Sequence, residues 1–349
     1  MSDVAAAANV SLSTASRALQ GSPLISYRTR LLIESTAEDL GYRPNRMASA
    51  LRSKKSHLIG LVLSNLKNVS FHTIAEVVQY KLSHEGYQLI VGTTGADAQI
   101  EKDLLQAFAD HGVDGVVVIG SGQNAGITNG LLRDGVAVVN VIRSSKDSAA
   151  PTVLAGDRDG SFAATENLIL QGHHRIGFIG GLASTDSGRE RLDGYVAALR
   201  SHGLAQDDAL IVQGPFTQEF GGHALALLLK QSPDMTALFA ANHEAVFGVL
   251  PMLVFRQIRI PEDLSLICYE DMPLLQMWHP PITVVDNGPT QMAELAVDLL
   301  MNQISDKSKS PQKHINRIYQ VGARLIDRKS CAPVTAADSP REGTACVPH

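Results

Sequence analysis

The feature that most constrains the fold is a regular alternation of short apolar runs with amphipathic helical stretches along most of the chain. The runs are rich in β-branched residues, which is typical of parallel strands buried on both faces. Because these strands alternate with helices, the sequence predicts an α/β body with two doubly wound parallel sheets. The strands are predicted at 58–63, 88–91, 115–119, 137–141, 176–179, 237–240 and 264–267, with helices such as 72–85 and 99–111 between them.

Length and composition narrow the class of protein. The chain has 349 residues, 44% of them hydrophobic, which suits two or three domains with large cores. No apolar run is long enough to span a membrane, and the first residues lack the features of a signal peptide. The three cysteines show no metal-ligand spacing and fit a reducing compartment. We therefore expect a cytoplasmic protein with no membrane partner.

Charge is distributed unevenly along the chain. Residues 1–57 carry a net charge of +4, whereas the remainder carries −9. A basic head on an acidic body is typical of a nucleic-acid-binding module attached to a sensing domain. Chance scatter of surface charge would give the same asymmetry, so the charge alone leaves both interpretations open.

The basic head begins with two short helices. The alanine-rich stretch 3–8 favours a helix, and Asn9 tolerates the left-handed conformation that a tight turn needs. Ser11 then stands where an N-cap belongs, ahead of a second helix over about 12–20. We expect Ala15, Ala18 and Leu19 to face inward on that helix.

A third helix follows the break at 21–23. Ser26 is its predicted N-cap and Gly41 its C-terminal residue. Helix, short turn, helix and a supporting helix make up a helix-turn-helix domain. The buried side of the third helix is predicted to consist of Leu31, Ile33, Ala37 and Leu40.

The second helix is polar on one side. Short hydroxyls suit phosphate oxygens, and the guanidinium of Arg17 can bridge O6 and N7 of guanine. Hydroxyl-rich helix starts are also common caps, and many small helical bundles bind nothing, so the pattern alone does not prove DNA binding. The polar residues are Ser11, Ser13, Thr14, Ser16 and Arg17.

Together these segments resemble the DNA-binding head of the LacI family of bacterial regulators. The matching motifs include Asn9-Val10-Ser11, Thr14-Ala15-Ser16-Arg17-Ala18-Leu19 and Leu40-Gly41-Tyr42-Arg43-Pro44-Asn45. The likeness continues through Gly172–Gly181, Arg191–Tyr195 and Ile260–Ile267, and covers roughly residues 3–328. It implies a helix-turn-helix head joined to a two-lobed sensor of the periplasmic-binding-protein type.

The resemblance also assigns the DNA contacts. Leu12 and Ser13 would read base edges in the major groove, with Arg17 as a third reader. Residues 45–52 would form a hinge helix that folds on DNA and inserts Leu51 into the central base step of the minor groove. The predicted DNA-binding residues are Ser11, Leu12, Ser13, Thr14, Ser16, Arg17, Ser26, Thr29, Asn45, Leu51 and Arg52.

Two departures from the family pattern affect the head. Only Met1 and Ser2 precede Asp3, where the family usually has more residues, so either the start lies upstream or the first helix is frayed. Leu12 is apolar where other members often present a polar reader, which would favour contact with a thymine methyl.

The resemblance and the composition together divide the chain into domains. The chain would cross between the lobes near Arg158, Asn287 and Gln320, and the Ser-, Pro- and Ala-rich tail is expected to be disordered. The predicted parts are 1–44 (helix-turn-helix), 45–57 (hinge helix and linker), 58–328 (ligand-binding and dimerisation domain) and 329–349 (tail). Within the domain, one lobe is about 58–158 with 288–320, and the other about 159–287 with 321–328.

A ligand in such a domain binds at the carboxyl ends of the strands, between the lobes. Arg191 could hold vicinal hydroxyls or a carboxylate, or instead form a salt bridge across its lobe. Phe71 and Phe216 could stack on a ring or simply pack, and Asn242 could bind hydroxyls or cap a loop. The positions that match the family's pocket are Phe71, Ser187, Arg191, Phe216, Asn242 and Glu270.

Departures in this pocket concern its acids. His243 follows Asn242 where the family usually has Asp, and Glu270 replaces another usual Asp. Losing one carboxylate and lengthening another suggests a changed ligand, so we advance the hypothesis that Arg191 with His243 recognises an acid.

Other functions fit less well. No Gly-x-Ser-x-Gly elbow, phosphate loop or dinucleotide motif is present, so we expect no enzyme and no cofactor. The histidines and cysteines show no metal-ligand spacing. A solute-binding protein without a DNA-binding role is the alternative, but it would not explain the basic head. The sequence thus predicts a transcription regulator, most simply a repressor, with a palindromic double-stranded DNA operator, a small-molecule effector (a sugar, a sugar acid or a related metabolite) and a homodimeric mate as partners.

Overall fold

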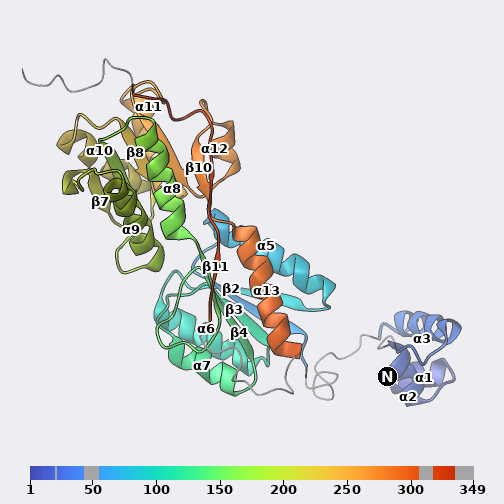
Figure 1. The fold of residues 1–349 in the computed structure, drawn as a ribbon. Helices are drawn as coiled ribbons and strands as arrows, with labels where there is room; N and C mark the ends of the chain where they lie inside the picture. Colours follow the sequence, from blue (N-terminus) through green and yellow to red (C-terminus); the bar gives the residue numbers. More distant parts are fainter. Residues whose placement is uncertain (20–21, 43–54, 306–316, 335–349) are drawn as a thin grey trace, which may run out of the picture. The chain divides into compact units, whose positions relative to one another are not determined.

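A computed structural model describes residues 1–19, 22–42, 55–305 and 317–334 (Figure 1). They belong to two compact units, residues 1–57 and the chain from Leu58 onward. In the part of the chain described, no helix is long and apolar enough to cross a membrane.

The head contains three helices among its described residues: α1 (Ser2–Ala7), α2 (Leu12–Leu19) and α3 (Tyr27–Asp39). Asn9 adopts the expected left-handed conformation, with φ of 51°. Val4 is fully buried against α2 and α3, so α1 is formed from Ser2 onward and is not frayed. The small core consists of Val4, Ala5, Ala8, Ala15, Ala18, Ile33 and Ala37.

The prediction for the buried side of α3 is wrong in part. Ile33 and Ala37 are buried as expected, but Leu31 and Leu40 are 47% and 51% exposed. Ile33 and Ala37 are four residues apart and share one face of the helix. Leu31 lies two residues before Ile33, which turns its side chain toward the opposite face.

The first lobe of the body contains a parallel six-stranded sheet in the order β11-β5-β4-β3-β1-β2. Its strands alternate side chains between two apolar layers, one packed on α5 and α13 and the other on α6 and α7. The elements are β1 (Leu58–Leu63), α5 (Val69–His84), β2 (Gln88–Thr93), α6 (Ala98–Asp110), β3 (Gly115–Val118), α7 (Ala125–Arg133), β4 (Ala137–Val141), β5 (Thr152–Ala155), α13 (Pro289–Ser305) and β11 (Ile318–Val321).

One strand departs from the prediction of complete burial. β2 lies at the edge of the sheet, and its residues are exposed or half-buried, with Val91 exposed. An edge strand has a neighbouring strand on one side only, so its residues are less covered than those of a central strand. Whether a strand lies at an edge depends on the strand order, which the apolar run does not encode.

The second lobe repeats the plan with the order β12-β10-β9-β8-β6-β7, in which only β12 pairs antiparallel. Helices α8 and α9 pack on one face of this sheet, and α10 and α11 on the other. The elements are α8 (Asp157–Leu170), β6 (Ile176–Gly180), α9 (Asp186–Ser201), a 3₁₀ turn (Asp208–Leu210), β7 (Ile211–Gln213), α10 (Gln218–Gln231), β8 (Ala237–Ala240), α11 (His243–Phe255), β9 (Ser265–Tyr269), α12 (Pro273–Met277), β10 (Thr283–Asp286) and β12 (Arg324–Ile326).

The chain passes between the two sheets three times. β5 leads through Gly156 to α8, β10 leads through 287–288 to α13, and β11 leads through 322–323 to β12. Figure 1 shows these connecting segments running side by side between the lobes. They lie within a few residues of the positions that the sequence suggests.

The expectation of a disordered tail is wrong for residues 329–334. Ser330 is fully buried; its Oγ donates to the Leu266 carbonyl (2.6 Å) and accepts from Thr283 N (2.7 Å). The Nε2 of His173 lies 3.0 Å from the carbonyl of Ala332. Composition favoured disorder, but this segment completes backbone hydrogen bonds of the second lobe. Residues 335–349 lie outside the described part.

Candidate functional site

The polar side of α2 is open to solvent. Ser11, Leu12, Ser13 and Arg17 are exposed, and Leu12 is 56% exposed although it is apolar. Ala15 and Ala18 hold the opposite side of the helix in the core. The helix therefore presents one apolar, one cationic and several hydroxyl groups on a surface that is not used for packing.

Two of the predicted phosphate-binding hydroxyls cap helices. Ser11 Oγ accepts from Thr14 N at 3.1 Å, and Ser26 Oγ accepts from Thr29 N at 3.2 Å. The Oγ atoms of Ser11 and Ser26 also pair with the hydroxyls of Thr14 and Thr29 at 2.7 and 2.8 Å. These caps bring hydroxyls and helix N-termini together, an arrangement that attracts anions. Ser16 is half-buried on α2.

The predicted hinge residues Asn45, Leu51 and Arg52 lie outside the described residues.

In the sensor domain, most of the predicted pocket residues converge at the carboxyl edge of the second sheet. Arg191, on α9, is only 3% exposed. Its Nε donates to Asp157 at 3.1 Å, its Nη1 donates to the Ala241 carbonyl at 2.7 Å, and its Nη2 lies 3.7 Å from Glu270. The guanidinium carbon is 3.8 Å from the ring centre of Tyr269. Arg191 is therefore fixed within its own lobe.

Glu270 connects Arg191 to the start of α11. Its Oε2 accepts from Asn242 Nδ2 at 2.9 Å and is paired with His243 Nδ1. Asn242 also caps α11 through a bond from Glu244 N at 2.8 Å. Glu270 has a φ of +76°, an unusual conformation for a residue other than glycine, and strained residues of this kind concentrate at functional sites.

The buried cluster is held by opposite charges. Burial opposes ionisation of His243, but its hydrogen bond to Glu270 and the negative charge there outweigh burial and raise the His243 pKa. The pKa of Glu270 is lowered in spite of burial, because His243 and Arg191 stabilise its charge. Burial raises the pKa of Asp157, only partly offset by Arg191. The two cations and two carboxylates therefore compensate one another.

The remaining predicted residues differ in position. The ring of Phe216 packs near Gly181, where an added Cβ would come within 2.4 Å of the ring, and its centre is 5.7 Å from the Arg191 guanidinium. Ser187 is buried on α9. Phe71 belongs to the apolar core of the first lobe. The structure thus brings together Ser187, Arg191, Phe216, Asn242 and Glu270 in one lobe, with Phe71 in the other.

Three members of the cluster were not among the predicted pocket residues. Asp157 follows β5, and its signal was an acid directly before Arg158, where a lobe crossing was predicted. Tyr269 ends an apolar strand, and nothing local indicates that its ring covers Arg191. His243 appeared only as a hypothetical acid receptor, whereas it is paired with Glu270.

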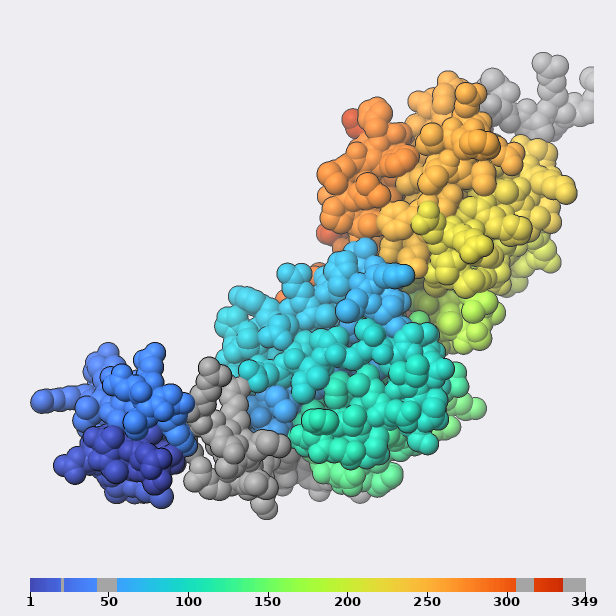
Figure 2. Space-filling model, turned by 180° about the vertical axis from the view of Figure 1, so that it is seen from behind, coloured from blue at the N-terminus to red at the C-terminus, as the bar shows by residue number. Residues whose placement is uncertain are grey.

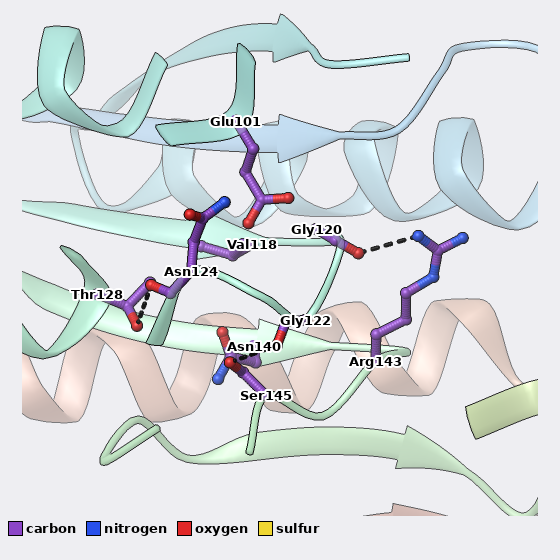
Figure 3. Close-up of a pocket in the computed structure, with 9 residues that line it drawn as sticks. All are labelled: Glu101, Val118, Gly120, Gly122, Asn124, Thr128, Asn140, Arg143 and Ser145. Atoms are coloured by element: carbon purple, nitrogen blue, oxygen red, sulfur yellow. Dashed lines mark hydrogen bonds between the residues drawn. The ribbon is translucent and has the colours of Figure 1, made fainter. Parts of the chain in front are cut away.

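The first lobe has a small polar pocket at the carboxyl ends of β3 and β4, with a cavity volume of about 10 Å³. Figure 3 shows the Glu101 carboxylate at its upper side and the Arg143 guanidinium turned away toward the Gly120 carbonyl. Arg143 Nη1 donates to that carbonyl at 3.0 Å and to Ser64 Oγ at 3.3 Å. Among the described residues, no three histidine, cysteine or acidic side chains gather as a metal site would need.

Fold and sites together define a class: a helix-turn-helix head joined to a two-lobed sensor. Residues 1–45 match the family model described as bacterial regulatory proteins, lacI family. Residues 165–331 match the model of a periplasmic binding protein-like domain.

Known proteins of similar length share this organisation. The HTH-type transcriptional repressor CytR of Escherichia coli (strain K12) is 29% identical over 327 residues, which cover 94% of this chain and 93% of CytR. The structure of a transcriptional regulator CelR–cellobiose complex is 29% identical, with a TM-score of 0.71 and coverage of 94% of this chain and 98% of that one. The Lac repressor dimer bound to operator and the anti-inducer ONPF has the same fold, with 21% identity, a TM-score of 0.81 and coverage of 95% and 98%.

The chain thus combines a DNA-binding domain of the lacI family with a periplasmic-binding-protein-like domain, and it is similar over most of its length to transcriptional regulators. It is a DNA-binding transcription regulator with a ligand-sensing domain.

Proposed function

We propose that the protein is a repressor that binds a palindromic operator as a homodimer in the cytoplasm, with an affinity set by a small effector in its sensor domain. The observation that carries this proposal is the exposed face of α2, where the groups predicted to read bases and to bind phosphates lie outside the core. The CytR relative is named as a repressor, which supports repression over activation.

The α2 face supplies the sequence readers. Leu12 contacts a thymine methyl or excludes a base by shape, Ser13 bonds a base edge, and Arg17 bridges guanine O6 and N7. Ser11, Thr14, Ser16, Ser26 and Thr29 hold phosphates and fix the register of the helix in the groove.

The hinge and the second subunit complete the operator contact. We propose that Asn45, Leu51 and Arg52 act in a hinge helix that pairs with its mate in the minor groove, where Leu51 wedges open a base step. The Lac repressor of the same fold is a dimer on its operator, which supports this arrangement. A two-fold dimer would require a palindromic site.

For the effector, we propose a neutral, hydroxyl-rich molecule. Both cations of the lobe-two cluster, Arg191 and His243, are already paired with carboxylates, which disfavours the hypothesis that they receive an acid. Carboxylates and the Asn242 amide suit ligand hydroxyls that donate hydrogen bonds. The CelR relative was solved with cellobiose, which supports a sugar.

Effector binding would act by changing how the two lobes are arranged relative to each other. A ligand that prefers one arrangement of the lobes shifts the dimer toward it, and the hinge helices move together or apart. Only the difference in ligand affinity between the two arrangements can drive this change.

The function is tested by selecting operators from random DNA with the purified protein and titrating salt. We expect an imperfect palindrome and a steep fall of affinity with salt, because several phosphates are contacted in each half-site. Arg17→Ala should relax one position of the selected sequence, whereas Arg200→Ala, an exposed arginine on α9, should leave it unchanged. Selection of no sequence by the wild type would contradict the proposal.

The effector class is tested by calorimetry with neutral sugars and the corresponding sugar acids. Saturable binding of a neutral sugar that is lost in Asn242→Ala is the expected result. Binding of sugar acids alone would restore the acid hypothesis and overturn the neutral class.

A further inference from the structure

The two lobes touch through a direct polar contact that involves neither the Arg191 cluster nor the crossing segments. Ser144 follows β4 in the first lobe, and Asp186 is the first residue of α9 in the second. The Ser144 amide and hydroxyl both donate to Asp186 Oδ2, at 2.8 and 2.6 Å. Because neither residue lies in a crossing, this contact can break without rearranging the chain that connects the lobes.

The bonds are made to a charged acceptor. Burial would raise the pKa of Asp186, but the two bonds from Ser144 and the Arg189 guanidinium, 2.5 Å away, outweigh burial and lower it. Asp186 also lies at a helix N-terminus, where negative charge is favoured. Hydrogen bonds to an ionised acceptor are stronger than those between neutral groups.

The first lobe adds a cation behind Ser144. Arg143 is anchored by the Gly120 carbonyl and Ser64 Oγ at the ends of β3 and β1, as Figure 3 shows for Gly120. Both Glu101, on the same lobe, and Asp186, across the gap, attract its charge. Neutral groups thus fix Arg143 to lobe one, and its positive charge attracts the Asp186 carboxylate of lobe two.

We propose that Ser144 and Asp186, supported by Arg143, form a latch that holds the lobes together when no effector is bound. The effector then binds a sensor whose lobes are already joined at this contact. The strength of the latch determines what fraction of the effector-free protein is in the open arrangement. The latch goes beyond the proposed effector site, because it requires no ligand.

The test is the distance between the lobes in the effector-free, full-length protein, measured by electron–electron double resonance. Spin labels are attached at Lys102→Cys on α6 and Arg200→Cys on α9, both exposed positions, in a background with Cys331→Ser and Cys346→Ser. Labelled protein is diluted with unlabelled protein so that distances within one subunit dominate.

The variants are Asp186→Ala, Ser144→Ala and Ser144→Pro, the last of which also removes the backbone donor. Asp193→Asn, an exposed acid on the same helix, is the matched control. We expect one short distance in the wild type and the control, and a rise of about tenfold in the longer-distance population for Asp186→Ala, as the loss of bonds to a charged group predicts. Ser144→Ala should give a smaller rise, because the amide donor remains.

Unchanged distances in both Asp186→Ala and Ser144→Ala, with native circular dichroism, would overturn the latch. A wild type that already populates the longer distance as its main state would overturn it as well. Neither outcome depends on operator binding or on the effector, so failure of the latch is distinguishable from failure of the proposed function.

Discussion

The head and the body use arginine in opposite ways. Arg17 is exposed to solvent on α2. Arg191 is buried, and all three of its guanidinium nitrogens face an oxygen of the same lobe. An arginine that binds a partner from solvent must keep its N–H donors free. A buried arginine such as Arg191 instead uses its donors in hydrogen bonds and ion pairs with neighbouring residues. Residue type alone therefore does not identify a ligand contact.

The largest expected difference between the exposed Arg17 and the buried Arg191 is in the effect of mutation on the free energy of unfolding. Glu270→Ala leaves Arg191 and His243 without their shared carboxylate, and removing one partner of a buried ion pair costs about 3–5 kcal/mol. We expect this loss in the free energy of unfolding of the body, measured by urea denaturation. Arg17→Ala should change the unfolding of the head by less than about 0.5 kcal/mol, as at other surface positions. Equal losses at the two sites would break the comparison.

The second largest effect is expected on operator affinity when the proposed hinge residue Leu51 is changed. Leu51→Ala removes the proposed apolar wedge, so the unstacked base step is no longer filled and operator affinity should fall by a few kcal/mol. Fluorescence anisotropy with a labelled operator measures the loss. The unfolding midpoint of the body is the control and should not move. A variant with normal operator affinity would show that Leu51 is not the wedge.

Arg17 itself should matter for sequence more than for general affinity. Arg17→Ala should cost about 1–3 kcal/mol on the selected operator and little on random DNA, because a base contact is lost and phosphate contacts remain. Competition binding with both DNAs gives the ratio. A uniform loss on both would assign Arg17 to the phosphate backbone instead.

The smallest effect is the pH dependence of the His243–Glu270 pair. A raised His243 pKa contributes stability below the unfolded value, about 6.5, and this contribution disappears as pH rises through the folded value. A lowered Glu270 pKa contributes above about 4.3 and is lost as pH falls through the folded value. The difference in unfolding free energy between wild type and His243→Gln should therefore be largest between about pH 4.3 and pH 6.5 and shrink as the pH rises further. A difference that grows with pH would show that His243 is buried neutral.

Local patterns predicted the head and the elements of the body well. The N-caps Ser11 and Ser26 and the turn at Asn9 follow from side-chain chemistry within a few residues. The strands β1 to β4, β6, β8 and β9 follow from apolar runs, and the two-sheet plan follows from their alternation with helices. The strands β5, β7, β10, β11 and β12 were not predicted. The resemblance to the family points to Arg191, Phe216, Asn242 and Glu270, which lie close together in the second lobe, while their role in ligand binding stays a prediction.

Only the tertiary structure decided what those residues do there. Asp157, Ala241 and Glu270 are far apart along the chain, yet they surround Arg191. Ala241 and Glu270 do so because the parallel strands β8 and β9 end at the same edge of the second sheet, whereas Asp157 begins α8 just after the chain has crossed from the first lobe. The packing of 329–334 and the contact of Ser144 with Asp186 likewise depend on long-range neighbours. Periodicity and capping are local and can be read along the sequence, whereas the pairing of buried charges is set by which chain segments the fold brings into contact.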